Sequence, residues 1–308
     1  MRIAILGATS QIAKDLIKSM SEAGNHELYL YARRPAVVER PPSDRTHRSI
    51  RHIGDYTSFG TNHEFDALIN FVGIGNPAAA AQMGADIFDI TLQFDQLALS
   101  YVRARPRCRY IFMSSGAAYG SDFVKPADRY TPATVPINRF TPQDWYGAAK
   151  LHAECRHRAY HDLPIIDVRI FNYFSASQDL NARFLICDIV RSIRDRTTLR
   201  TSAENIVRDY LHPSDFYRLI EAALNSSSTN DAVDGYSRSP IDKFTLLSRM
   251  KDKFGLNFEL VELRTGVNST GTKPNYYSLN NRASELGYEP ALNSIKGVVR
   301  EAAVLLNL

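Results

Sequence analysis

Short apolar segments alternate with longer segments of helical period along the first half of the chain. The apolar segments read RIAILG, HELYLYA, DALINFVG and RYIFMSS, and between them lie QIAKDLIKSMSEAG and an amphipathic stretch from about Ala85 to Val102. Strands that alternate with helices predict right-handed crossovers and a parallel sheet covered by helices. We therefore expect an α/β fold, a Rossmann-like, doubly wound parallel sheet.

The pattern continues and then loosens in the second half. A helix through Tyr146 to about His161 precedes the apolar strand IIDVRIF, but beyond Asn172 we expect more loops, such as NSSSTNDAVDG and RTGVNSTGTKPN. We predict a nucleotide-binding domain over residues 1–172 and a smaller, mainly substrate-binding region over residues 173–308, with parts near 207–237 returning to the core. Ligands of such sheets bind at the carboxyl ends of the strands.

Composition narrows the class of protein. The chain has 308 residues, is 44% hydrophobic and carries a net charge of only +4, so it predicts a globular protein with no nucleic-acid partner. Three scattered cysteines indicate a reducing compartment. No run of about 18 apolar residues occurs, so we expect a cytoplasmic protein without a membrane partner. Cys155 lies near His152 and His157, but the spacings match no usual metal set, and we predict no metal site.

A glycine turn follows the first strand. GATSQIA, residues 7–13, opens a helix, which is the context in which such a turn binds a dinucleotide pyrophosphate at a helix N-terminus. Only the first glycine of the usual three is kept, and Ser10 and Ala13 replace the others. An ordinary turn between strand and helix is the alternative. The candidate cofactor contacts in this turn are Gly7, Thr9, Ser10, Gln11 and Ile12.

The end of the second strand bears on the choice of cofactor. An NAD site places an acid there for the ribose hydroxyls, but this chain reads YARRP, with Arg33 and Arg34 after Ala32. Guanidinium groups suit a ribose 2′-phosphate, because each can donate a bidentate pair of hydrogen bonds. We therefore predict NADP(H) in preference to NAD(H), although two arginines in a surface loop can also lack a ligand.

The stretch DWYGAAKLHAE carries the candidate chemistry. Tyr146 and Lys150 are four residues apart, and on a helix such positions share a face, so the ammonium can favour the phenolate. Ser114 and Ser115 end the strand RYIFMSS. In a reduction, Tyr146 would protonate a carbonyl oxygen that Ser115 holds. Tyr146 could instead merely pack, and Ser115 could merely satisfy backbone groups.

With these residues in order, the chain resembles the extended short-chain dehydrogenase/reductase family, in particular its nucleotide-sugar epimerase and reductase members. The resemblance rests on the segments GATSQIA, GDY, DALINFVG, MSSGAAYG, the Tyr146 and Lys150 pair, VRIFNYF, VRDYLHPSD and ASELGYEP. It implies a catalytic set of Ser115, Tyr146 and Lys150. It further implies cofactor contacts from Asp55, Tyr56, Phe71, Val72, Tyr146 and Lys150.

The resemblance also implies where the substrate binds. It places Ser114, Ser115, Gly116 and Asn172 near a nucleotide-sugar substrate, and it places Arg208 near the substrate diphosphate. Arg264 is a second candidate for the diphosphate. Arg208 could alternatively be an ion-pair partner of Asp209.

Departures from the family pattern guide the choice of reaction. Dehydratases carry an acidic pair after the serine, whereas this chain has Gly116, Ala117 and Ala118. We predict an NADPH-dependent reductase of a nucleoside-diphosphate keto sugar, such as a 4-keto-6-deoxyhexose. An NAD-dependent nucleotide-sugar 4-epimerase, a reductase of small ketones and a non-catalytic NADP-sensing regulator remain as alternatives. The family's asparagine near residues 87–95 is replaced, with Asp89 or Thr91 nearest to its position, and the resemblance implies a homodimer.

Overall fold

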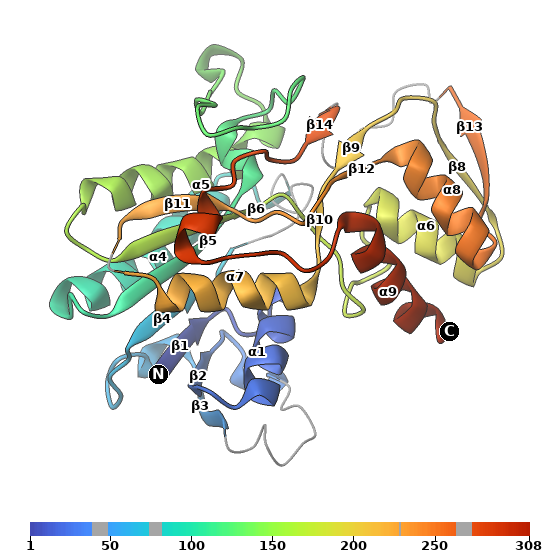
Figure 1. Ribbon diagram of the computed structural model, residues 1–308. Coiled ribbons are helices and arrows are strands. Elements are labelled where there is room, and N and C mark those ends of the chain that lie inside the picture. Colours follow the sequence, from blue (N-terminus) through green and yellow to red (C-terminus); the bar gives the residue numbers. More distant parts are fainter. Residues whose placement is uncertain (39–48, 74–81, 228, 263–272) are drawn as a thin grey trace.

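Seven parallel strands form the central sheet of the computed structural model, which describes residues 1–38, 49–73, 82–227, 229–262 and 273–308 (Figure 1). The strands are β1 (Arg2–Leu6), β2 (Glu27–Tyr31), β3 (Ile50–Gly54), β4 (Ala67–Asn70), β5 (Arg109–Ser115), β6 (Ile165–Ile170) and β11 (Asp231–Asp234). Their order is β11-β6-β5-β4-β1-β2-β3, and every neighbouring pair is parallel. The order reverses between β1 and β4, the point where such sheets bind ligands. The predicted doubly wound α/β fold is confirmed.

Helices cover both faces of this sheet. Helices α1 (Gln11–Ala23) and α7 (Pro213–Asn225) share one hydrophobic cluster with the sheet, and α4 (Asp86–Ala104) and α5 (Pro142–Ala159) flank its other face. Successive side chains of a strand point to opposite faces. Accordingly, Ile3 and Ile5 of β1 belong to the first cluster, and Ala4 and Leu6 belong to the second. Such full burial on both faces explains why β1 reads as a continuous apolar run.

Local signals set the ends of the two helices that matter most for the site. The Ser10 side chain caps α1 by accepting from the Ala13 amide, and Gly24 ends the helix with a left-handed φ of 70°. Helix α5 begins with a capping box between Thr141 and Asp144. These caps place the glycine turn and Tyr146 near helix N-termini.

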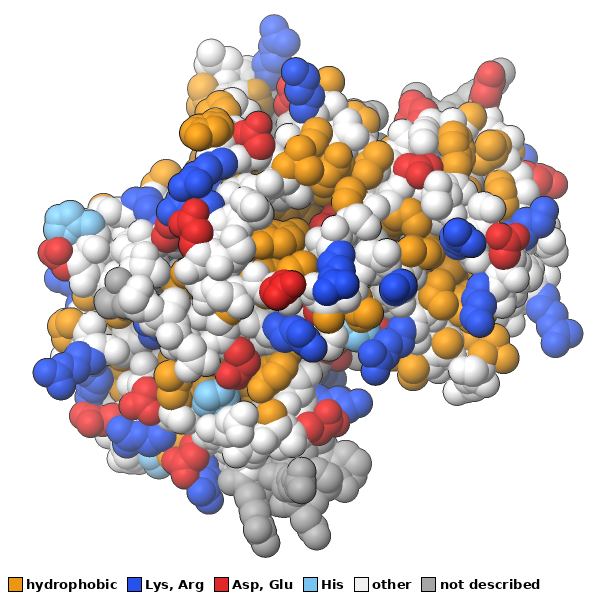
Figure 2. All heavy atoms as spheres, viewed as in Figure 1, with side chains coloured by type: hydrophobic (Ala, Val, Ile, Leu, Met, Phe, Trp, Pro, Cys, Tyr) orange, Lys and Arg blue, Asp and Glu red, His pale blue; other side chains and the backbone are white. Residues whose placement is uncertain are grey.

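The remaining elements build a second lobe beside the sheet. Its helices are α6 (Leu185–Arg194), α8 (Lys243–Phe254) and α9 (Ser294–Leu306), which share a separate hydrophobic cluster. Short strands pair in three small sheets, β7 (Asn172–Tyr173) with β10 (Tyr210–Leu211), β8 (Thr198–Ser202) with β13 (Asn257–Val261), and β9 (Val207–Arg208) between β12 (Ile241–Asp242) and β14 (Asn275–Tyr276). Single 3-10 turns are η1 (Pro35–Val37), η2 (Tyr56–Ser58), η3 (Gly116–Tyr119), η4 (Ile137–Arg139) and η5 (Arg282–Leu286). Figure 2 shows hydrophobic side chains gathered between the two lobes.

One predicted loop was wrong. The segment NSSSTNDAVDG contains β11, an edge strand of the central sheet that pairs in parallel with β6. The four residues of this strand, DAVD, show no alternation of polar and apolar positions and so carry little local signal; the strand is buried by its pairing with β6, and Val233 is 2% exposed. Among the described residues, every helix is too short or too polar to cross a lipid bilayer.

Candidate active site

The glycine turn lies between β1 and α1 at the switch point of the sheet. Gly7 has a φ of 79°, and a Cβ on it would lie 2.9 Å from backbone atoms of both Phe71 and Val72. A side chain is therefore excluded for two independent reasons. The first turn of α1 follows at once, with Thr9 exposed and Ser10 half-buried. An accessible helix N-terminus beside a bare backbone turn fits a pyrophosphate group.

Contacts from the neighbouring segments surround this turn. The Gln11 amide nitrogen donates a 3.0 Å hydrogen bond to Ser175 Oγ, which ties α1 to the second lobe. Ile12 packs against the core cluster beneath. Burial raises the pKa of the Tyr56 phenol, while the Gly7 amide and the charge of Arg33 act in the opposite direction. Tyr56 therefore lies at the glycine turn, as a cofactor contact would.

Arg33 and Arg34 are both exposed, directly after the buried end of β2. Asp55 follows β3, and its carboxylate accepts from the Thr57 and Ser58 amides at 3.0 and 3.2 Å. These bonds lower the pKa of Asp55, the Thr57 hydroxyl contributing most. Asp55 thus caps η2, a structural role that the sequence did not reveal.

The three predicted catalytic residues meet at the carboxyl end of β5. Ser115 ends the strand, and Tyr146 and Lys150 come from α5. Helix α5 comes close to this strand end because Gly147 has no side chain, and a Cβ there would overlap the Ala117 carbonyl oxygen. The Lys150 ammonium donates a 2.8 Å hydrogen bond to the Met113 carbonyl oxygen. All three side chains are buried, at 5%, 7% and 6% exposure respectively.

The spacing of Tyr146 and Lys150 does not by itself make the phenol acidic. Burial raises the pKa of Tyr146, and a hydrogen bond from Ser115 lowers it in part. Lys150 Nζ is 5.9 Å from the centre of the Tyr146 ring. Burial also lowers the pKa of Lys150 to about 8, against the charges of Asp95, Glu154 and Asp167. In this geometry the hydrogen bond with Ser115, and not the charge of Lys150, is what lowers the pKa of Tyr146.

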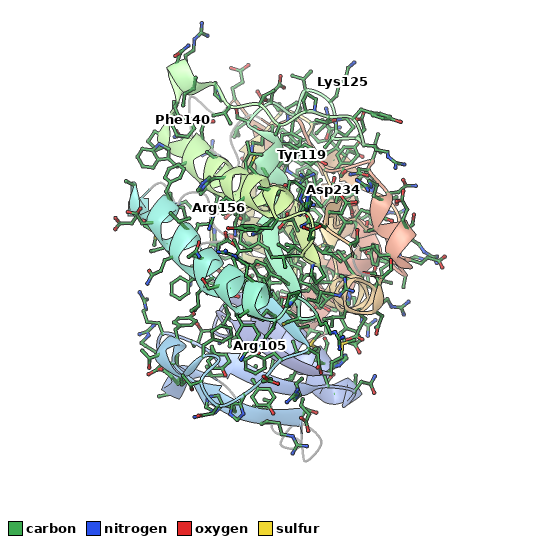
Figure 3. The ribbon with its side chains drawn as sticks, turned by 90° about the vertical axis from the view of Figure 1, so that its left-hand side faces the viewer. Arg105, Tyr119, Lys125, Phe140, Arg156 and Asp234 are labelled. Atoms are coloured by element: carbon green, nitrogen blue, oxygen red, sulfur yellow. The ribbon has the colours of Figure 1, made fainter. Side chains whose placement is uncertain are left out.

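A buried ionic network lies beneath the site and was missed from the sequence. His157 Nδ1 is 2.6 Å from Asp167 Oδ1 and His157 Nε2 is 2.7 Å from Asp95 Oδ1, and all three side chains are fully buried. Arg156, labelled in Figure 3, adds a 2.5 Å bond to Asp95 Oδ2. Burial opposes a charge on His157, but Asp167 and Asp95 outweigh it and raise its pKa to about 9. The sequence feature that could have indicated this network is the run of polar residues in the helical segment HAECRHR, residues 152–158.

A second buried chain of contacts runs from Ser114. Its hydroxyl donates to Glu154 Oε1 at 2.5 Å, and Glu154 also accepts from the Arg169 guanidinium. Arg169 Nη1 lies 3.6 Å from Asp234, which accepts from the Tyr119 hydroxyl (Figure 3). Ser114 is therefore hydrogen-bonded to Glu154, while Ser115 is hydrogen-bonded to the Tyr146 phenol. Gly116 is buried against the Phe171 ring.

The candidate substrate residues approach the same strand end from the second lobe. Asn172 Nδ2 donates to the carbonyl oxygens of Asp209 and Tyr276 at 3.3 and 3.1 Å. The Arg208 guanidinium donates to the Val207 carbonyl oxygen at 2.8 Å, and burial lowers the pKa of Arg208. Asp209 instead accepts hydrogen bonds from Ser237 and Ser294, so it is not the partner of the Arg208 charge. Arg264 lies outside the described residues.

The helix position that the family fills with asparagine also differs. Thr91 is buried, and its hydroxyl donates to the Ile87 carbonyl oxygen of its own helix at 2.7 Å, whereas Asp89 is exposed. Asp95, one turn further along α4, provides the buried carboxylate instead. Tyr276 and Lys273 also lie near the site, and no sequence pattern pointed to either.

Comparisons with known proteins agree with this geometry. The sequence profile of the NAD dependent epimerase/dehydratase family matches residues 3–236. A UDP-glucuronic acid 4-epimerase from Bacillus cereus superposes with a TM-score of 0.78 at 16% identity, covering 100% of this chain and 99% of that one. The UDP-glucose 4-epimerase of Thermotoga maritima gives the same four values. A dTDP-glucose 4,6-dehydratase from Bacillus anthracis has a TM-score of 0.75 at 16% identity, with 99% and 96% coverage. No curated protein matches the chain.

Proposed function

The chain belongs to the NAD-dependent epimerase/dehydratase family, and from this premise we propose that it reduces a nucleoside-diphosphate keto sugar with NADPH. The observation that carries the proposal is the convergence of Ser115, Tyr146 and Lys150 at the carboxyl end of β5. A 4-keto-6-deoxyhexose is one sugar that would suit such a reaction.

The residues around the glycine turn fit a dinucleotide. Gly7 leaves backbone room, the N-terminus of α1 faces the turn, and Tyr56 lies beside it. Phe71 and Val72, which follow β4, lie directly against the Gly7 turn. Arg33 and Arg34, exposed after β2, would hold a ribose 2′-phosphate. When bound, the cofactor supplies the hydride.

The side chains of the protein would then manage the proton and the position of the sugar. Ser115 holds the carbonyl oxygen by a hydrogen bond, and Tyr146 gives its proton to that oxygen. Lys150, whose Nζ lies 5.9 Å from the centre of the Tyr146 ring, would stabilise the phenolate that remains by its positive charge. Asn172 and Arg208 would bind the sugar and its diphosphate, because both project from the second lobe toward this strand end.

A nucleotide-sugar 4-epimerase is the second candidate. Two of the structural relatives are named as 4-epimerases, and one of them was determined with NAD. An epimerase removes a hydride and returns it in one turnover, so it would retain its cofactor. A non-catalytic NADP-sensing regulator is the weaker alternative, because such a protein has no need of the buried Ser115, Tyr146 and Lys150 set.

The cofactor distinguishes the two enzyme candidates. Purified protein would be denatured and any released nucleotide identified by chromatography, after which NADPH and NADH affinities would be measured on cofactor-free protein. We expect little bound nucleotide and a preference for NADPH. Stoichiometric, tightly held NAD would contradict the reductase and favour the epimerase. Keto sugars on nucleoside diphosphates would then be screened for turnover.

We also infer a homodimer that forms through α4 and α5. These helices lie side by side on one outer face (Figure 3), where Leu92 is 40% exposed and Leu151 is half-buried. Sedimentation of the wild type and of a Leu92→Asp variant tests this, since a charge at the interface should shift the chain to monomers.

The three free thiols suit a reducing compartment, so we place the enzyme in the cytoplasm.

A further inference from the structure

Tyr276 joins the catalytic serine to the candidate substrate residues. It lies on β14, is 5% exposed, and its phenol oxygen is 3.4 Å from Ser115 Oγ. Its backbone carbonyl accepts from Asn172 Nδ2 at 3.1 Å, and its neighbour in register on β9 is Arg208. The ring packs between Phe123 and Phe171, with centroid distances of 4.8 and 5.2 Å. The phenol is therefore held in place independently of its hydroxyl.

The hydrogen-bond inventory of Ser115 gives this contact a direction. A serine hydroxyl has one hydrogen to donate and two sites at which to accept. Ser115 Oγ accepts from the Ala117 amide at 3.2 Å. If Tyr276 donates to the second acceptor site, the single serine hydrogen is left for Tyr146, with which Ser115 shares a hydrogen bond. If Ser115 donated to Tyr276 instead, that hydrogen would be lost to Tyr146.

The surroundings of Tyr276 favour its role as the donor. Burial raises its pKa more than the hydrogen bonds with Ser115 and the Ala117 amide lower it, so the phenol keeps its proton across the range in which an enzyme works. The titratable groups near it are Lys273, with Nζ 4.8 Å from the ring centre, Arg208, with its guanidinium carbon at 6.0 Å, and the Tyr146 phenol. The Ala117 amide also bonds to the Tyr276 oxygen, which leaves the phenol hydrogen free for Ser115.

We propose that Tyr276 is a positioning residue whose hydroxyl donates to Ser115 Oγ and so directs the serine hydrogen toward Tyr146. The three hydroxyls then form one relay of hydrogen bonds, in which Tyr276 donates to Ser115 and Ser115 donates to Tyr146. Only Tyr146 gives a proton to the substrate. During turnover, which rests on the proposed function, the single Ser115 hydrogen passes from Tyr146 to the substrate oxygen, while Tyr276 still donates to Ser115 Oγ. The second lobe thereby contributes to the chemistry as well as to binding.

The first test needs no substrate. The protein would be labelled with tyrosine carrying ¹³C at Cζ, and the Tyr146 resonance would be identified by its absence in Tyr146→Phe. We expect Tyr276→Phe to raise the pKa of Tyr146 by about half a unit or more, because a donor to its hydrogen-bond partner is lost. Tyr277→Phe, at the next residue along the chain, is the matched control and should leave that pKa unchanged. An unchanged Tyr146 pKa in Tyr276→Phe would overturn the relay.

The second test measures turnover and coupling. With a nucleotide keto sugar that the wild type reduces, Tyr276→Phe should lower kcat about tenfold, with KM and NADPH affinity within about twofold of the wild type. In a Ser115→Ala background, the same substitution should have little further effect on the Tyr146 pKa or on kcat, and full additivity would contradict the relay. Absence of turnover in the wild type would count against the proposed function alone, because the titration still decides the role of Tyr276.

Discussion

Lys150 donates a 2.8 Å hydrogen bond from its ammonium nitrogen to the carbonyl oxygen of Met113, two residues before Ser115 on β5. The bond joins the helix that carries Tyr146 to the strand that carries Ser115. The same ammonium lies 4.5 Å from the centre of the Phe112 ring. Lys150 thus anchors the two elements of the site to each other, besides supplying charge.

Tyr146→Phe should remove the proton donor and leave the fold intact. We expect turnover of any accepted nucleotide sugar to fall by about 10² to 10⁴, the usual contribution of a positioned acid. NADPH affinity, measured by fluorescence titration, should change far less than turnover, because phenylalanine keeps the ring of this candidate cofactor contact. Tyr160→Phe, further along the same chain segment, serves as the control. Wild-type turnover in Tyr146→Phe would show that another group protonates the substrate.

His157 should make stability depend on pH in a defined window. Its pKa in the folded chain is about 9 against an ordinary 6.5, so its contribution to stability is complete below about pH 6.5 and is lost as the pH rises through 9. The full effect is at most about 3 kcal/mol. The pKa of Lys150 is lowered to about 8, so its deprotonation above that pH stabilises the fold and opposes the effect of His157. The pH dependence of His157 must therefore be taken from a comparison of variants.

Urea denaturation of wild type and His157→Gln at several pH values provides that comparison. We expect the difference in the free energy of unfolding to shrink as the pH rises from about 6.5 to 9. A difference that stays constant over this range would mean that His157 is not charged between Asp95 and Asp167.

Glu154→Gln should destabilise the protein far more than a comparable surface substitution. Glu154 is 4% exposed and accepts from Arg169 and Ser114, so its neutralisation leaves the half-buried Arg169 without its closest charge partner. Loss of one member of a buried pair costs about 3 to 5 kcal/mol.

The matched control for Glu154 is Glu27→Gln, which breaks the exposed pair with Arg51 at 2.7 Å. Surface pairs contribute about 0 to 1 kcal/mol. Chemical denaturation of both variants gives the comparison directly. Equal effects of the two substitutions would contradict the inference that the Glu154 and Arg169 pair is protected from solvent.

The double substitution Arg33→Ala with Arg34→Ala tests the cofactor preference. Each guanidinium that binds a phosphate contributes a charge-assisted hydrogen bond of about 1.5 to 3 kcal/mol, so NADPH affinity should fall at least about tenfold. NADH affinity should change little, because that cofactor lacks the 2′-phosphate. Arg51→Ala, an exposed arginine on β3, controls for the loss of surface charge. A parallel loss of both affinities would refute a specific phosphate contact.

Local patterns in the sequence were sufficient for the main elements of the fold. The alternation of apolar and helical segments predicted β1, α1, β2, β4 and β5, because residue periodicity is a property of neighbouring positions. The glycine turn and the Tyr146 and Lys150 spacing are local in the same sense. The strand β11 was missed because its four residues gain their burial from β6 and not from their own pattern.

What the sequence determined by itself is therefore the order of the elements and the residue types at the end of each strand. Only the tertiary structure decided which of those residues meet. Tyr276 reaches Ser115 across 161 positions of the chain, and His157 reaches Asp95 across 62. Contacts of that kind depend on how separate elements pack, and no periodicity within a short segment records them. The same packing decided that burial, more than the spacing to Lys150, governs the acidity of Tyr146.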